Sequence, residues 1–235
     1  MKVALVGGQS FGVAVLKLLD ELEHEIVTVV SKPDDKLTRV VVDDWGLGWC
    51  HPLDLDSSVT QGIDLIVAAH NHIYIRQSVL DAANYGGISY HPSLLPRHRG
   101  KDAIRWTIHM RDPIAGGTVY WLDKRVDGGP VAAQDWCFVD PSWTASDLWR
   151  ERLFGMGVEL IRKTVTDVSE GRIIKEPQDE RFASWEPSWE RPPLRTTVTE
   201  SQTEPGGASA PSRISSPREP QLATDDGEGD LPALA

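Results

Sequence analysis

Two side chains suited to acid–base chemistry lie close together in a short, mostly apolar segment. Residues 88–91, Ile-Ser-Tyr-His, predict a strand, and Pro92 ends it because proline has no backbone N–H to give to a sheet. His91 is therefore expected at the carboxyl end of the strand, where open α/β sheets bind their ligands. Because side chains alternate along a strand, Ser89 and His91 are expected to share one face.

A carboxylate suited to pair with that imidazole lies in a glycine-rich turn. Asp127 belongs to the run Val-Asp-Gly-Gly-Pro at 126–130, where the backbone freedom of glycine lets a turn hold a side chain at a fixed angle. A carboxylate beside an imidazole favours the protonated ring and orients it. The imidazolium then donates to an oxyanion forming on a carbonyl carbon, and the carboxylate steers the proton of the attacking group. The residue types alone leave open a structural role for both, as a strand-end histidine and a turn aspartate.

The apolar segments predict the scaffold that positions these side chains. Strand-like and helix-like patterns alternate, which favours an α/β, Rossmann-like fold with a doubly wound, mostly parallel sheet. Asp34 and Asp35 are expected to cap the second helix. The expected strands are 2–6, 25–30, 64–69, 88–91, 131–139 and a short one at 171–174, and a short strand and turn are expected at 45–52. The expected helices follow the turn at 7–12 and cover 36–44, 76–83 and, as one long covering helix, 143–168.

The composition narrows the class of protein. The 235 residues carry a formal net charge of −11, which argues against nucleic acid as a partner, because a phosphate backbone selects a basic surface. Cys50 and Cys137 are the two cysteines, too few for a disulfide scaffold. No segment approaches the roughly 18 apolar residues of a membrane span, and no signal-peptide pattern opens the chain. These features predict a cytoplasmic protein without a membrane partner, and they are silent on its oligomeric state.

Other residues have the types that bind ligands. The turn at 7–12 precedes a helix, whose free N–H groups attract anions, but it lacks the GxGxxG dinucleotide pattern and is equally a tight strand-to-helix turn. His70 and His72 have no carboxylate or cysteine at ligand spacing, and neither has Cys50–His51, so no metal is expected. A local basic patch is either a solvated loop or a site for an anionic group, and it consists of Arg97, His98, Arg99 and Lys101.

Several motifs resemble the formyltransferases that use 10-formyltetrahydrofolate. The most specific is Tyr-His-Pro-Ser-Leu-Leu-Pro-Arg-His-Arg-Gly at 90–100, and Gly-Thr-Val at 117–119 and Val-Asp-Gly-Gly-Pro at 126–130 follow it. The chain is similar to the hydrolase domain of 10-formyltetrahydrofolate dehydrogenase, and it also resembles methionyl-tRNA, glycinamide ribonucleotide and amino-sugar formyltransferases. The resemblance covers most of residues 1–190 and implies the formyltransferase fold.

The resemblance also implies roles for individual residues. It makes His91 the catalytic histidine and Asp127 the catalytic aspartate. Family transferases usually carry an asparagine two residues before the histidine, where this chain has Ser89, and losing one oxyanion donor costs on the order of a hundredfold in rate. The pterin of 10-formyltetrahydrofolate, the expected formyl donor, is placed against the backbone of Ile73, Tyr74, Ile75, Lys124, Arg125 and Val126.

The implied activity is formyl transfer from 10-formyltetrahydrofolate to an amine of a small-molecule acceptor. Hydrolysis to tetrahydrofolate and formate, or a folate-binding module with little catalysis, are alternatives that the sequence leaves open. No RNA-contacting or aldehyde dehydrogenase domain follows in this sequence, so neither initiator-tRNA formylation nor the full dehydrogenase reaction is expected. The expected organisation is a formyltransferase catalytic domain at 1–177, a docked polar extension with two tryptophans at 178–193, and an acidic, disordered tail at 194–235.

Overall fold

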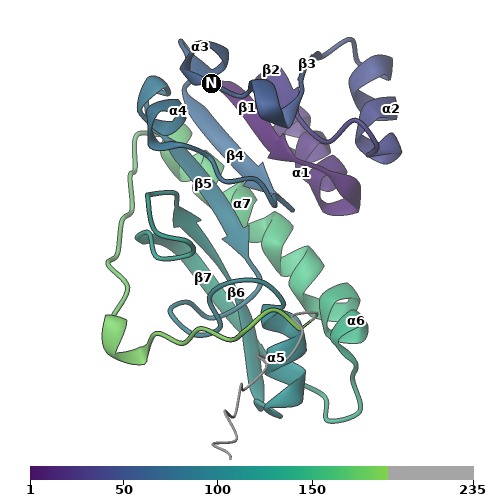
Figure 1. The fold of residues 1–235 in the computed structure, drawn as a ribbon, viewed down its shortest axis with the longest axis vertical. Helices are drawn as coiled ribbons and strands as arrows, with labels where there is room; N and C mark the ends of the chain where they lie inside the picture. Colours follow the sequence, from purple (N-terminus) through teal and green to yellow (C-terminus); the bar gives the residue numbers. More distant parts are fainter. Residues whose placement is uncertain (190–235) are drawn as a thin grey trace, which may run out of the picture. The chain divides into compact units, whose positions relative to one another are not determined.

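The structure is a computed structural model that describes residues 1–189. Its centre is a seven-stranded sheet with the order β3-β2-β1-β4-β5-β6-β7 (Figure 1). The first five strands of that order are parallel, and β6 and β7 form an antiparallel hairpin beside β5. The predicted mostly parallel α/β sheet is therefore confirmed. The strands are β1 (Lys2–Gly7), β2 (Glu25–Val30), β3 (Gly48–Cys50), β4 (Leu65–Ala69), β5 (Gly87–His91), β6 (Ile114–Trp121) and β7 (Val131–Phe138).

Both faces of the parallel part are covered, which is why β1 and β4 are continuous apolar runs. Successive side chains face opposite sides, so Leu5 joins one core cluster and Val6 joins another. The first cluster contains residues of α1 (Gln9–Glu21) and α7 (Phe154–Ser169), and Figure 1 shows α7 crossing behind the strands. The second contains residues of α4 (Gln77–Ala82). Apolar clusters therefore lie against both faces of the parallel part of the sheet.

The loops at the carboxyl edge carry short helices, and several bounds differ from those expected. α2 (Lys36–Asp44) has the predicted bounds, because Asp35 caps it as expected. β3 is the strand within the short strand and turn expected at 45–52, and Pro52 begins a 3₁₀ turn, η1 (Pro52–Asp54), which α3 (Ser57–Thr60) follows. The imidazole of His51 accepts the backbone N–H of Leu53, so this histidine caps η1. α5 (Ala103–His109) follows the loop after β5.

The expected single helix at 143–168 is broken. It consists of α6 (Ala145–Leu148), a π-helical turn η2 (Trp149–Leu153), and α7. The buried hydroxyl of Tyr90 donates to the carbonyl of Leu153 at 2.8 Å, within the segment where the helix changes its winding. The rings of Trp149 and Phe154 both pack against Phe11 of α1. Packing against the core therefore accompanies the break in this helix, which the apolar periodicity could not show.

The prediction of a short strand at 171–174 is wrong. This segment has no strand partner; the carbonyl of Ile174 instead accepts the indole N–H of Trp121 at 2.6 Å. The chain then pairs with β7 through one bridge, in which Val131 and Glu176 exchange backbone hydrogen bonds of 2.8 and 2.9 Å. A strand needs neighbouring ladder bonds, and the chain turns away after this single pair.

Residues 175–189, here named the C-terminal strap, return along the hairpin to the loop after β5 (Figure 1). Ser184 exchanges backbone bonds with Pro96 and Arg99, and the indole of Trp106 donates to Pro187. A 3₁₀ turn, η3 (Glu180–Phe182), lies in its middle. The strap includes most of the segment predicted as a docked extension, and the tail predicted at 194–235 lies outside the described residues. Among residues 1–189, no helix combines the length and apolar composition that a bilayer span needs.

Candidate active site

His91 ends β5 and is buried, with 8% of its surface exposed. Its Nε2 lies 2.7 Å from the backbone carbonyl of His98. Because a carbonyl oxygen only accepts hydrogen bonds, the proton of the neutral ring belongs on Nε2. Nδ1 is then the nitrogen that remains for chemistry, and it lies 3.7 Å from Oδ2 of Asp127.

The loop after β5 is held so that the His98 carbonyl can meet the ring. Thr118, directly opposite His91 on β6, donates to the carbonyl of Ser93 at 2.7 Å and accepts the N–H of Leu95 at 3.1 Å. The side-chain amide of Gln134 on β7 donates to the Leu95 carbonyl at 3.0 Å. The hairpin therefore fixes the loop, and the loop fixes the tautomer of His91.

Asp127 lies in the loop between β6 and β7 and is oriented by two donors. The phenol of Tyr120 donates to Oδ1 at 2.6 Å, and the backbone N–H of Gly100 donates to Oδ2 at 2.7 Å. The left-handed backbone angle of this turn belongs to Asp127 itself, with φ of 51°, and not to the glycines that follow it. Gly129 is needed for close approach, since a Cβ there would lie 1.7 Å from the carbonyl oxygen of Trp121. The turn thus aims the carboxylate at His91.

Tyr120 was not predicted as a site residue from the sequence. Its phenol contacts the site through Asp127. It is 4% exposed and lies on β6 directly opposite Ser89. Burial, followed by the charge of Asp127, raises the pKa of this phenol well above its usual value, so the hydroxyl stays protonated as a donor. In the sequence, the signal for this residue is a tyrosine in the strand before the acidic turn. Its contact with Asp127 could not be predicted, because it depends on how the strands pair.

Ser89 and His91 extend from the face opposite Ile88 and Tyr90, which belong to the core cluster of α1 and α7. The half-buried hydroxyl of Ser89 interacts with the phenol of Tyr120, where it counteracts the rise in the pKa of that phenol. The structure therefore brings Ser89, His91 and Asp127 into one group, with Tyr120 between the serine and the aspartate.

The two segments expected to hold the pterin lie on this same face. Ile73, after β4, and Leu122, which precedes Lys124, both pack against the core cluster of α4. The side chain of Asn71 bonds both the N–H and the carbonyl of Ile73, at 2.9 and 2.8 Å, and Asp123 accepts the N–H of Arg125 at 2.7 Å. Part of this backbone is thus already occupied. The other expected contact residues are Tyr74, which is exposed, Ile75, which is buried, and Lys124 and Val126, which are exposed.

Three residues of the predicted basic patch have partners inside the protein. Arg99 is 5% exposed, and its guanidinium bonds the Gln178 amide oxygen and both carboxylate oxygens of Glu180. The buried ring of His98 lies between two carboxylates, 2.8 Å from Asp112 and 3.0 Å from Glu186. Arg97 also pairs with Asp112, at 3.2 Å. This part of the patch is therefore neither a solvated loop nor an open anion site, because the C-terminal strap and the segment after α5 satisfy it.

The turn that precedes α1 is occupied by a carboxylate of the chain itself. Oδ2 of Asp35 accepts the N–H of Gln9 at 2.7 Å, and a Cβ on Gly8 would lie 2.0 Å from that oxygen. Burial acts to raise the pKa of Asp35, but hydrogen bonds from Thr38 and Gln9 outweigh it and hold the pKa below its usual value. The anion that the start of this helix attracts is therefore Asp35.

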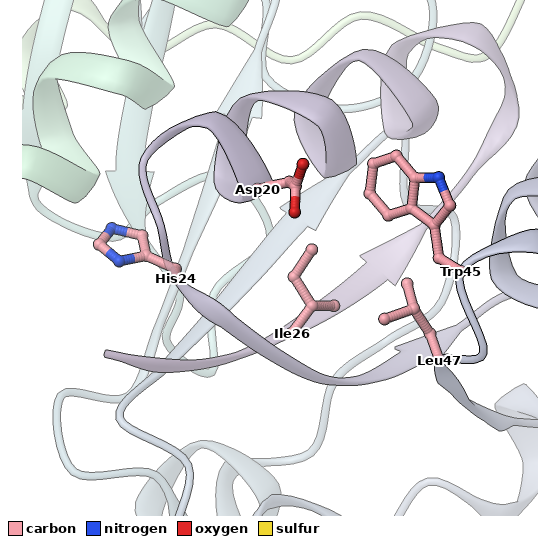
Figure 2. A pocket seen from close by; sticks show the side chains of 5 residues that line it. All are labelled: Asp20, His24, Ile26, Trp45 and Leu47. Carbon is pink, nitrogen blue, oxygen red and sulfur yellow. The ribbon is translucent and has the colours of Figure 1, made fainter.

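The remaining candidates do not form a ligand site near His91. The rings of His70 and His72 stack edge to face at 4.9 Å, and burial lowers the pKa of both. Across the described chain, no group of three or more His, Cys, Asp or Glu side chains is arranged to hold a metal ion. A shallow pocket of about 340 Å³ lies beside the amino end of β2. Figure 2 shows the side chains that line it, which are Asp20, His24, Ile26, Trp45 and Leu47.

Comparison with known proteins gives one family. Residues 54–162 match the family described as formyl transferase. The mitochondrial 10-formyltetrahydrofolate dehydrogenase of Mus musculus is 34% identical over 201 residues, which are 79% of this chain. The chain spans 22% of the length of that relative, and the same share of the other dehydrogenases it matches.

Solved structures with the same fold include two formyl-transferring enzymes. Glycinamide ribonucleotide transformylase 1 from Symbiobacterium toebii has a TM-score of 0.66 at 23% identity, over 75% of this chain and 91% of that one. The N-formyltransferase from Helicobacter canadensis, in complex with folinic acid and dTDP-3-aminofucose, has a TM-score of 0.68 at 14% identity, over 79% of this chain and 70% of that one. Sequence and fold agree, and this chain carries a domain of the formyl transferase family.

Proposed function

We propose that this chain transfers the formyl group of 10-formyltetrahydrofolate to an amine of a small-molecule acceptor. The observation that carries the proposal is the pairing of His91 Nδ1 with Asp127 Oδ2 at 3.7 Å, at the carboxyl end of β5. The dehydrogenase and N-formyltransferase to which the chain is similar are named for 10-formyltetrahydrofolate or were crystallised with a folate. The segments 73–75 and 124–126 are the proposed pterin contacts, on the same face as His91.

In the proposed mechanism, the acceptor amine attacks the formyl carbon. Asp127 takes the proton that the amine loses, and His91, protonated on both nitrogens, donates from Nδ1 to the developing oxyanion. When the tetrahedral intermediate collapses, the bond from the formyl carbon to N10 of the folate breaks, and that nitrogen receives the proton. The products are an N-formyl amine and tetrahydrofolate. Both proton-handling groups are half-buried or buried, where such interactions are stronger than in water.

Hydrolysis is the second candidate, and the position of Asp35 favours it. A phosphorylated acceptor would find the start of α1 already occupied by the Asp35 carboxylate, whose oxygen accepts the Gln9 N–H at 2.7 Å. A water nucleophile needs no contact with the start of α1. With water as the nucleophile, the same two residues yield formate and tetrahydrofolate, and Asp127 takes the proton of water instead of that of an amine.

The test is turnover of 10-formyltetrahydrofolate by the purified chain, alone and with a panel of amines, compared with Asp127→Ala. Turnover that requires an amine and is lost in the variant supports transfer and identifies the acceptor class. Turnover without an amine, also lost in the variant, supports hydrolysis. If the chain binds the folate without turnover under any condition, and His91→Ala and Asp127→Ala bind it equally well, a binding module replaces both enzymes.

A further inference from the structure

We propose that Tyr120 is a positioning residue that fixes the Asp127 carboxylate, and that Ser89, directly opposite Tyr120 in the sheet, supports it. The inference rests on the proposed function, because it concerns the residue that prepares the proposed catalytic aspartate.

The first step is the register of β5 and β6. Their antiparallel pairing places Ser89 directly opposite Tyr120, and His91 directly opposite Thr118. Residues opposite each other in an antiparallel pair extend from the same face with neighbouring side chains. Tyr120 is therefore held beside Ser89 and His91 by strand pairing and not by a flexible loop.

The second step is the set of donors around Asp127. Oδ1 accepts the Tyr120 hydroxyl at 2.6 Å and Oδ2 accepts the Gly100 N–H at 2.7 Å, so each carboxylate oxygen has one donor. One donor alone would leave the carboxylate free to rotate about its own bond. With both, its plane is fixed, and Oδ2 faces Nδ1 of His91.

The third step is the state of the phenol. Tyr120 is 4% exposed, and burial together with the Asp127 charge raises the pKa of its hydroxyl well above the usual value. The phenol therefore stays protonated and donates to Asp127. Ser89 lies beside it, directly opposite on β5.

The test compares Tyr120→Phe with the parent chain in the turnover of 10-formyltetrahydrofolate. Losing one buried hydrogen bond to a charged group is expected to lower kcat by about 10- to 100-fold, with KM changed by less than about twofold. Ser89→Ala is expected to lower kcat less, and to have no further effect in the Tyr120→Phe background.

Tyr90→Phe is the matched control. Tyr90 is the neighbouring buried tyrosine, but it faces the other side of the sheet and donates to the Leu153 carbonyl at 2.8 Å. This variant is expected to lower thermal stability while kcat and KM stay those of the parent. A Tyr120→Phe chain with the kcat of the parent would overturn the positioning role. Effects of Ser89→Ala and Tyr120→Phe that multiply would overturn the coupling of the serine to the tyrosine.

A readout independent of turnover separates this inference from the proposed function. The 13C chemical shift of the Asp127 carboxyl carbon can be measured by NMR at neutral pH in the parent and in Tyr120→Phe, with Tyr90→Phe as the control. A chemical shift that changes in Tyr120→Phe and not in Tyr90→Phe supports the positioning role even if no substrate is turned over, in which case the proposed function alone fails. Equal chemical shifts in all three chains contradict the positioning role whatever the enzyme does.

Discussion

At the scale of single residues, the site depends on backbone groups as much as on side chains. The His98 carbonyl determines which nitrogen of His91 carries the proton, and the Gly100 N–H orients Asp127. His91 and Asp127 could be proposed from sequence because a strand-end histidine and a glycine-rich acidic turn are local patterns. Tyr120 could not, because its contact with Asp127 depends on where β6 ends and how the following loop folds back.

Gly129→Ala tests whether the close packing of the Asp127 turn matters. The added Cβ would lie 1.7 Å from the Trp121 carbonyl oxygen, so the turn must move and Asp127 with it. We expect a loss of about 1–3 kcal/mol in the free energy of unfolding, measured by chemical denaturation, and a larger proportional loss of turnover. Gly155→Ala, in α7 with no atom within 4 Å of the added Cβ, is the control and should be neutral or slightly stabilising. Equal effects of the two substitutions would argue against a role for close approach.

At the scale of elements, one carboxylate joins two helices. Asp35 caps α2 through the N–H of Thr38 at 3.1 Å and also accepts the Gln9 N–H at the start of α1. The cap on α2 was predictable, because an aspartate before an apolar periodic run is a local signal. The contact with α1 spans 26 residues of sequence and required the sheet to bring the two loops together.

Asp35→Ala is expected to destabilise the fold at neutral pH by about 1–2 kcal/mol, the usual value of a helix cap. The pKa of Asp35 is held below the ordinary 3.8, so its ionised form contributes stability above that value. This contribution is lost as the pH falls through the lowered pKa, and the difference between parent and variant should shrink there. Denaturation curves from pH 7 to pH 2 measure it, with Asp34→Ala, a change at the exposed neighbour, as the control. A difference that stays constant with pH would contradict the assignment.

At the scale of the molecule, the C-terminal strap holds the loop after β5 in place. The buried guanidinium of Arg99 has its carboxylate and amide partners at residues 178 and 180, and His98 has one of its two carboxylates at 186. These pairs join segments about 80 residues apart, which is why sequence reasoning described the basic residues as one patch without naming their partners. The strands at 25–30 and 88–91 were predictable because their apolar runs are local. The strand expected at 171–174 was not realised, because the chain meets the edge of the hairpin in a single bridge.

Shortened chains test whether the C-terminal strap supports the loop after β5. The described contacts of the strap extend to Trp189, so a chain ending at Pro192 is expected to keep the melting temperature and turnover of the full chain. A chain ending at Lys175 lacks Gln178 and Glu180, the partners of the Arg99 guanidinium. It should melt well below the full chain and lose turnover. If both shortened chains behave alike, the strap does not support the loop.

The most direct measurement follows the formyl carbon of 10-formyltetrahydrofolate, labelled with 13C, in the presence of the parent chain and of Asp127→Asn. The parent is expected to move the label from the folate to an N-formyl amine or to formate. Asp127→Asn should bind the folate with similar affinity and move the label about 100-fold more slowly or worse, because it lacks the proton acceptor. Label that leaves the folate equally fast with both chains would contradict the proposed pairing of His91 with Asp127 as the centre of the reaction.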